Sequence, residues 1–228
     1  MPLNKNLEMA EFAMNPEQRC ACVLLLDTSK SMDGEKIAAL NAGLHTFQDE
    51  LSKDHLAALR VEVAVVTFDS SVKVLQDFVA AGEFRPPKLS ADGTTHMGTG
   101  IQQALDLIDG RKATYKANGV QYYRPWIVML TDGEPYGEAD VIVDQAIKRL
   151  RDAEQNKRVV FFAVGVDGAN MDRLKLIAPP GREPRMLSGM RFNELFVWLS
   201  GSMSAVSNSK IGDQVSLPSA GGWESISS

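Results

Sequence analysis

The chain has 228 residues, of which 24 are Lys or Arg and 29 are Asp or Glu, so its formal net charge is -5. With 44% hydrophobic and 23% charged residues, its composition is typical of a folded domain and not of a disordered chain. The acidic balance argues against a nucleic-acid partner. No apolar run approaches the roughly 20 residues of a membrane span, so we also expect no membrane partner.

The length suits one domain with short tails. We expect a polar N-terminal arm at 1–18, the domain at 19–207, and a flexible Ser- and Gly-rich tail at 208–228 that carries Trp223. The first residues lack the apolar core of a secretory signal. Cys20 and Cys22 are the only cysteines, and we predict two buried thiols because residues two apart on a strand are poorly placed to form a bridge. These features favour a cytoplasmic protein.

Apolar and β-branched segments predict strands, in chain order, at 20–26, 61–68, 72–78, 126–130, 159–166 and 185–187. Apolar residues at steps of three and four predict helices between them, at 35–52, 101–108, 139–153, 171–177 and 192–207. The segment 72–78 follows its predecessor after only a short turn, so we expect it to pair back as an antiparallel edge strand.

Strands that alternate with helices predict an α/β fold, a Rossmann-like three-layer α/β/α sandwich around a mostly parallel six-stranded sheet. In the doubly wound strand order 3-2-1-4-5-6, the strand at 20–26 lies beside the strand at 126–130. Asp27 follows the first of these strands and Asp132 follows the second. The two carboxylates should therefore meet at the carboxyl edge of the sheet, where such folds bind ligands.

Three sequence blocks carry a family resemblance. They are Asp27-x-Ser29-x-Ser31, the block Gly93-Thr94-Thr95, and Thr131-Asp132-Gly133-Glu134. In this order and at the ends of predicted elements, they resemble the blocks of a von Willebrand factor A (vWA) domain over residues 19 to 205. Within that family the pattern is most similar to bacterial tellurium-resistance proteins of the TerY type, although no cysteine follows Cys22 to form the zinc-binding extension that some of those carry.

The resemblance implies a metal-ion-dependent adhesion site (MIDAS), with Asp27, Ser29, Ser31, Thr95 and Asp132 as the metal-binding residues. Hydroxyl and carboxylate oxygens suit Mg²⁺, with Mn²⁺ or Ca²⁺ as alternatives, and argue against Zn²⁺. Two carboxylates balance the charge of a divalent ion, so an acidic ligand is attracted to it. The chain is thus expected to be a non-enzymatic module that binds an Asp or Glu of a protein partner.

The resemblance to the TerY type further implies a bacterial stress-response setting, with a kinase or phosphatase of the same system as partner. Two alternatives stay open at this point. A metal-dependent phosphatase-like hydrolase would also begin with Asp27, but it needs a second acid where Ser29 stands. A structural vWA scaffold with a vestigial site is the other. His96, Glu134 and Tyr136 are candidates for the rim of the site, and a solvated loop is the more ordinary place for His96.

Overall fold

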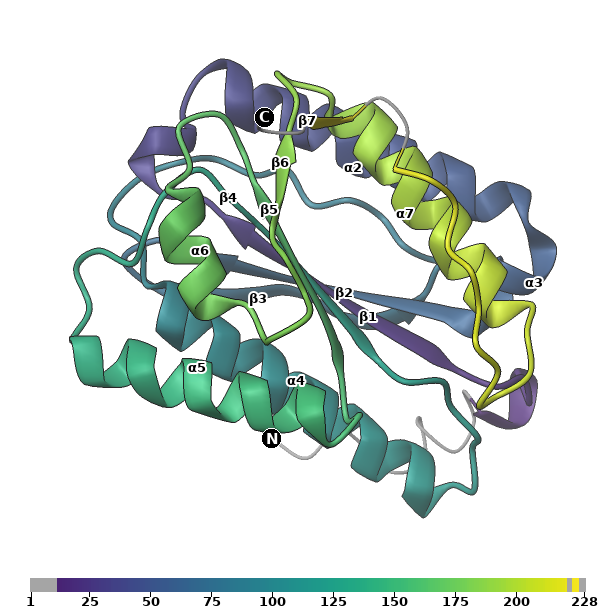
Figure 1. Ribbon diagram of the computed structural model, residues 1–228. Helices are drawn as coiled ribbons and strands as arrows, with labels where there is room; N and C mark the ends of the chain where they lie inside the picture. Colours follow the sequence, from purple (N-terminus) through teal and green to yellow (C-terminus); the bar gives the residue numbers. More distant parts are fainter. Residues whose placement is uncertain (1–11, 221–222, 226–228) are drawn as a thin grey trace.

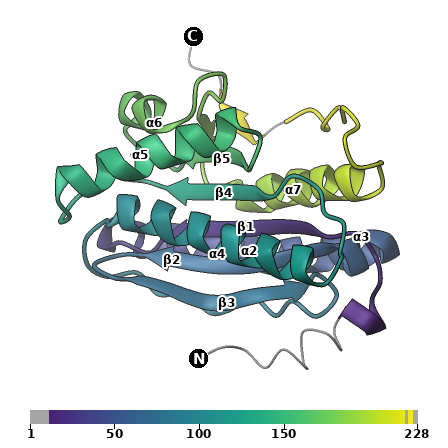
Figure 2. The ribbon, with the colours of Figure 1, turned by 90° about the horizontal axis from the view of Figure 1, so that it is seen from below.

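The computed structural model describes residues 12–220 and 223–225. Its centre is one mixed sheet with the strand order β3-β2-β1-β4-β5-β6-β7. The strands are listed here in chain order: β1 (Cys20–Asp27), β2 (Val61–Phe68), β3 (Val72–Ala80), β4 (Trp126–Thr131), β5 (Val160–Gly165), β6 (Arg185–Leu187) and β7 (Glu224–Ser225). Figure 2 shows β3 at one edge of the sheet and β2, β1 and β4 following it in turn.

Helices cover both faces of the sheet, which gives the predicted three layers (Figure 1). One face carries α2 (Glu35–Lys53), α3 (His55–Arg60) and α7 (Phe192–Ser207), while α4 (Met97–Ala117), α5 (Asp140–Gln155) and α6 (Met171–Ile177) lie on the other. A short 3-10 helix, η1 (Lys30–Met32), follows β1. The side chains of β1 and β2 are buried at every position, because a central strand of such a sheet is covered on both sides.

The predicted fold class is confirmed. Strands β1, β2, β4, β5 and β6 pair in parallel, and β3 pairs with β2 as the antiparallel edge strand. The predicted neighbours β1 and β4 lie side by side, with Leu24 opposite Val128. Cys20 and Cys22 are buried free thiols, as expected, and burial raises the pKa of Cys22 to about 12. No helix in the described part of the chain is long and apolar enough to cross a membrane.

Besides the short η1, one helix and one strand were not predicted. The helix α3 starts a separate turn after α2, because the Asp54 side chain accepts hydrogen bonds from the amides of Leu56 and Ala57 and so caps a new helix. The strand β7 is a two-residue addition, antiparallel to β6, that brings the sheet to seven strands. Both are too short to leave a periodic pattern in the sequence.

The expectation of a free Trp223 in a flexible tail is wrong for that residue. Trp223 is 1% exposed, and its ring lies 5.3 Å from that of Trp198 on α7. Its carbonyl accepts a hydrogen bond from Ser188 N, and the indole of Trp198 donates to the carbonyl of Pro218. The segment after α7 therefore packs against the domain at these points, because two large aromatic surfaces bury each other there.

A buried ion cluster around Glu62 joins β2 to the N-terminal arm and to α4. Glu62 and Arg19 are both 1% exposed and form a 2.8 Å ion pair, and Arg111 binds both carboxylate oxygens of Glu62. The hydroxyl of Tyr115 donates to the same carboxylate. Phe12 lies beneath both guanidinium groups, at 5.3 and 5.2 Å from its ring centre. Here the arm is part of the domain.

Replacing Glu62 by Gln should lower the free energy of unfolding by about 3 kcal/mol or more, since two guanidinium groups would lose their buried counter-charge. Urea unfolding followed by circular dichroism measures this. The matched control is Glu50→Gln, which removes an exposed pair with Lys53 and should cost less than about 0.5 kcal/mol. Equal losses for the two variants would contradict the importance of the buried cluster.

Candidate metal centre

Three loops meet at the carboxyl edge of the sheet. The first follows β1 and contains Ser29 and Ser31, the second precedes α4 and contains Thr95, and the third follows β4 and contains Asp132. Asp27 is the last residue of β1. Because β1 and β4 are adjacent and parallel, their ends open at the same place, and the loops after them are forced together.

Asp27 is fully buried and fixed at both carboxylate oxygens. Its Oδ1 accepts a 2.8 Å hydrogen bond from the amide of Ser29, and its Oδ2 accepts one from the hydroxyl of Thr131. The Thr131 hydroxyl in turn accepts from the amide of Gly133. The Asp27 carboxylate is thus held between the ends of β1 and β4, oriented by one backbone amide and one side-chain hydroxyl.

Ser29, Ser31 and Asp132 form a chain of oxygen contacts. The hydroxyl oxygens of Ser29 and Ser31 are 3.0 Å apart, and the Ser31 hydroxyl donates to Asp132 Oδ1 at 2.7 Å. The other oxygen, Oδ2 of Asp132, receives the ammonium group of Lys36 at 2.5 Å. Lys36 lies in the first turn of α2, so the helix after the first loop supplies a cation to the cluster.

Thr95 completes the group. Its side-chain oxygen lies 3.8 Å and Asp27 Oδ2 lies 4.0 Å from the position that a Cβ atom on Gly133 would take. Thr95 and Tyr136 also exchange two backbone hydrogen bonds of 3.0 Å, which tie the loop before α4 to the loop after β4. The structure therefore brings all five sequence-predicted residues to one place.

A residue not singled out in the sequence fixes the start of α4. Glu138 accepts hydrogen bonds from the amides of Gly98 and Thr99 and from the Thr99 hydroxyl. Gly98 itself faces the backbone of Val143, which would lie 2.8 Å from an added Cβ, so only glycine permits this approach of α4 to α5. Through these contacts Glu138, two residues before α5, and α5 itself hold in place the helix that follows Thr95.

Burial raises the pKa of Asp27 from 3.8 to about 6, although hydrogen bonds from Ser29 and Thr131 lower it, and the charge of Asp132 contributes to the increase. The ionised centre therefore carries an unfavourable negative charge that a cation would relieve. In the described structure the ammonium of Lys36 provides part of this relief.

The residues present fit a divalent cation on chemical grounds. Carboxylate and hydroxyl oxygens are the donors that Mg²⁺, Mn²⁺ and Ca²⁺ prefer, and a positive group already contacts one of the carboxylates. Among residues 12–220 and 223–225, no three His, Cys, Asp or Glu side chains gather in a way that could hold a metal. The five predicted residues include only two carboxylates, Asp27 and Asp132. The other three donors to a cation at this centre would be the hydroxyl groups of Ser29, Ser31 and Thr95.

The rim candidates occupy different positions. Tyr136 is 70% exposed beside Thr95, and Ser31 is also exposed, so the centre has a solvent-facing side. His96 is half-buried and contacts the Gly137 carbonyl through Nε2 at 3.0 Å. Glu134 accepts a 3.3 Å hydrogen bond from Asn170 and does not join the oxygen cluster through any described contact. Glu134 and Tyr136 are both exposed, and of these two Tyr136 is the one joined by backbone hydrogen bonds to Thr95.

Sequence reasoning missed Lys36, Thr131 and Glu138. Thr131 stands within one of the quoted blocks, and its position next to Asp132 at the end of a strand was the available signal. Lys36 is spaced like an ordinary polar helix residue, and Glu138 lies in a loop without a motif. Lys36 contacts Asp132, and Glu138 contacts the start of α4, only because the fold brings together segments that are far apart in the chain.

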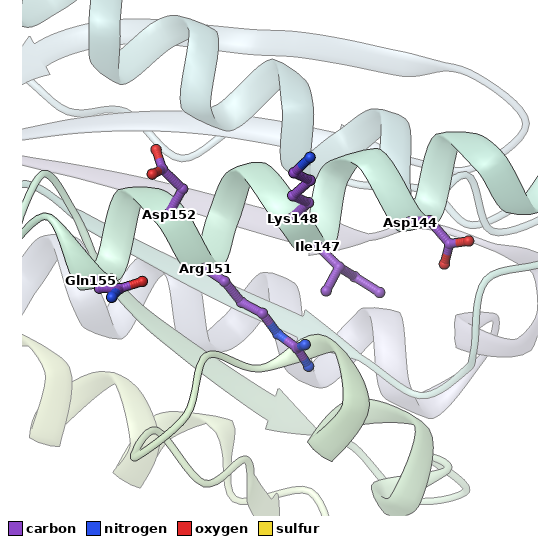
Figure 3. Close-up of a pocket in the computed structure, with 6 residues that line it drawn as sticks. All are labelled: Asp144, Ile147, Lys148, Arg151, Asp152 and Gln155. Carbon is purple, nitrogen blue, oxygen red and sulfur yellow. The ribbon is translucent and has the colours of Figure 1, made fainter.

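A surface hollow on α5 does not add to this chemistry. Figure 3 shows its six lining side chains, all from α5, with Arg151 directed away from the helix. Arg151 donates to the carbonyl of Leu176 on α6, and its Nε has no hydrogen-bond partner among the described residues. The hollow carries two acidic and two basic side chains, as on a solvated helix face, so we assign it no function.

Comparison with known proteins identifies the family. The model of the von Willebrand factor type A domain matches residues 22–196, which is most of the chain. The chain therefore belongs to the vWA family, a class of domains that often carry metal-dependent protein-binding sites. No protein among the curated sequences matches it.

Solved structures share the fold at low sequence identity. A von Willebrand factor type A protein from Catenulispora acidiphila has 19% identity and a TM-score of 0.61 over 82% of this chain and 43% of its own. The pilus adhesin SpaC from Lactobacillus rhamnosus GG has 14% identity and a TM-score of 0.64, with 83% and 30% coverage. The PilB minor pilin from Streptococcus sanguinis has 15% identity and a TM-score of 0.57, with 82% and 62% coverage. The chain thus spans less than two thirds of each of these proteins.

The raised pKa of Asp27 predicts a pH dependence of the metal-free protein. Since the folded state holds this proton more tightly than the unfolded state, Asp27 lowers the free energy of unfolding as the pH rises from about 4 to about 6. The accumulated loss is on the order of 2 to 3 kcal/mol at neutral pH. Asp27→Asn should remove this decrease in the free energy of unfolding between pH about 4 and about 6. In the presence of a chelator, the variant should therefore be more stable than the parent at neutral pH, but not at pH about 4. A constant difference between the two proteins across the range would contradict the assignment.

Proposed function

We propose that this vWA domain is a metal-dependent protein-binding module. Asp27, Ser29, Ser31, Thr95 and Asp132 hold a divalent cation, Mg²⁺ or alternatively Mn²⁺ or Ca²⁺, and the cation attracts an Asp or Glu of a protein partner. The observation that carries the proposal is the convergence of these five oxygen-bearing side chains from the end of β1 and three loops. Contacts of 2.7 and 3.0 Å join Ser29, Ser31 and Asp132, and Asp27 and Thr95 both lie beside Gly133.

The chain's own residues set up this recognition. Thr131 and the Ser29 amide orient the Asp27 carboxylate, so its position does not depend on the cation. The cation supplies a positive charge that two carboxylates offset without excess, and neutral hydroxyls add donors without adding charge. The exposed side of the centre, at Ser31 and Tyr136, is where a partner carboxylate can approach. A Tyr side chain there offers both apolar surface and a hydroxyl.

Catalysis is the second candidate, and no specific contact favours it. A phosphatase with Asp27 as nucleophile needs a general acid two residues later, and Ser29 stands there with its hydroxyl 3.0 Å from that of Ser31. We therefore propose a module without enzymatic activity. Hydrolysis of a generic phosphate ester that requires Mg²⁺ and disappears in Asp27→Ala would replace this proposal with the phosphatase.

The cellular setting is proposed from the sequence resemblance alone. Similarity to TerY-type proteins suggests a cytoplasmic protein of a bacterial tellurite or stress-response system, with a kinase or phosphatase of that system as partner. The short, charged and metal-dependent contact proposed here suits a regulated and reversible association.

Lys36 and the cation compete for Asp132, which gives a direct test. Lys36→Gln should tighten Mg²⁺ binding several-fold, because a positive charge next to the cation is removed. Isothermal titration calorimetry measures the affinity. The matched control is Lys30→Gln. Lys30 lies in η1, pairs with Asp33 and is exposed, so its removal should change the affinity little. Weaker binding in Lys36→Gln would show that the lysine supports the site instead.

Partner binding should depend on both the metal and Asp27. Affinity purification from the native cell with the parent chain should recover a partner that is lost when a chelator is added and is not recovered by Asp27→Ala. Asp33→Ala is the control, because Asp33 is an exposed carboxylate of the same loop that lies outside the oxygen cluster. A partner that is retained by Asp27→Ala or in chelator would refute a metal-bridged contact.

A further inference from the structure

A groove of about 970 Å³ lies at the amino ends of β4 and β5, whereas the metal centre lies beyond the carboxyl ends of β1 and β4. It is lined by the first residues of β4 and β5, by the end of α4 and by the segment that follows α7. In Figure 1 the end of α4 and the segment after α7 both lie toward the end of the sheet at which β4 begins. Since β4 has six residues, the groove and Asp132 are separated by about 20 Å.

The groove is strongly basic although the whole chain is acidic. Seven of its lining residues are Lys or Arg, and Asp213 is the one acidic residue among them. Glu154 binds both Arg124 and Arg182 at 2.9 Å, so this part is already balanced. In the described part of the chain, however, no acidic side chain pairs with the exposed Lys116, Lys157 or Lys210.

Like charges crowd each other in the groove. Burial lowers the pKa of Lys112, and the nearby charges of Lys116 and Arg158 contribute to the same decrease. Lys157 has a backbone φ of 54°, in the left-handed region that favours glycine, and it nevertheless carries a long cationic side chain at the end of α5. Each of Lys116, Lys157 and Lys210 lies at or just after the end of a helix, where a cation complements the negative helix end. The fold brings these three helix ends to one groove, and their cationic side chains gather there.

The chemistry of the groove selects among anionic ligands. The helices α4 and α5 reach the groove with their C-termini, where carbonyl groups and not amide groups are free. The groove therefore lacks the row of amide donors with which a helix N-terminus binds a phosphate group. Its aromatic rings pack against other groups. Tyr123 and Trp126 are each 4% exposed, and Phe162 packs on Trp126 at 4.9 Å with Arg182 at 5.5 Å on its ring. Tyr122 is half-buried, and its ring packs on that of Tyr115 at 5.2 Å. The groove therefore offers no row of open rings on which successive nucleic-acid bases could stack.

Separate lysines on flexible stems, together with apolar surface, suit a peptide instead. Ile211 is 42% exposed on the wall formed by the segment after α7, and Val215 and Leu217 are half-buried beside it. We propose that this groove binds a short acidic segment of a protein partner, whose carboxylates meet Lys116, Lys157 and Lys210 and whose apolar side chains meet this wall. The contact needs no metal, because none of the oxygen cluster takes part in it.

The test uses a fluorescein-labelled, glutamate-rich synthetic peptide with leucine and phenylalanine residues, and fluorescence anisotropy with the full chain. The peptide should bind at low salt, bind more weakly as salt is added, and be unaffected by a chelator. Lys116→Glu with Lys157→Glu should weaken binding by about tenfold or more. The matched control is Lys88→Glu with Lys148→Glu, two exposed lysines without an ion pair in the described structure, and it should bind within about twofold of the parent.

Several results would overturn the proposal. They are no binding by the parent, equal loss in both double variants, or preference for a single-stranded oligouridylate over the peptide. Binding that a chelator or Asp27→Ala abolishes would place the peptide at the metal centre. Because the chelator arm separates the two sites, failure of the groove leaves the proposed metal-dependent function standing, and failure of the metal function leaves the groove.

Discussion

The carboxylate of Asp27 lies out of water at the carboxyl edge of a parallel sheet, where burial and the charge of Asp132 raise its pKa to about 6. Such an arrangement persists only if the surrounding structure holds it and a positive charge relieves it. Hydrogen bonds from Thr131 and the Ser29 amide hold the first carboxylate, and Lys36 neutralises part of the second. Much of the architecture at this edge, including the contacts between the Thr95 and Tyr136 loops, serves to keep these groups together.

The same constraint explains why so much of the centre could be predicted. Once β1 and β4 were identified as neighbours, Asp27 and Asp132 had to meet, because the ends of adjacent parallel strands share an edge. The position of Thr95 could not be predicted from strand order, because a long segment without strands separates it from β3. Only the resemblance to the vWA blocks indicated that Thr95 belongs to the site. Lys36 and Glu138 act through contacts between segments far apart in the chain, and neither has a local pattern that marks it.

The missed features of the fold have a similar origin. The helix α3 depends on one capping aspartate, and β7 on the docking of Trp223 against Trp198 and β6. A Ser- and Gly-rich composition predicts mobility, yet one large indole can bury enough apolar surface to fix a short segment. Glu62 was likewise unremarkable in an apolar strand, although the structure surrounds it with Arg19, Arg111 and Tyr115.

The domain thus presents two chemically different surfaces at opposite edges of one sheet. At the carboxyl ends of the strands, the proposed recognition depends on a cation and on acidic residues of the chain itself. At the amino ends of the strands, the proposed recognition depends on lysines and exposed apolar side chains. Both would select acidic features of a partner, and a partner long enough to span about 20 Å could engage both edges. Contact at two sites would raise the effective affinity without strengthening either one.

Anomalous diffraction from crystals grown with Mn²⁺ tests the metal centre itself. We expect a peak beside the side-chain oxygens of Ser29, Ser31 and Thr95, with Lys36 moved away from Asp132. A map without such a peak at saturating Mn²⁺, with Lys36 still on Asp132, would contradict this expectation.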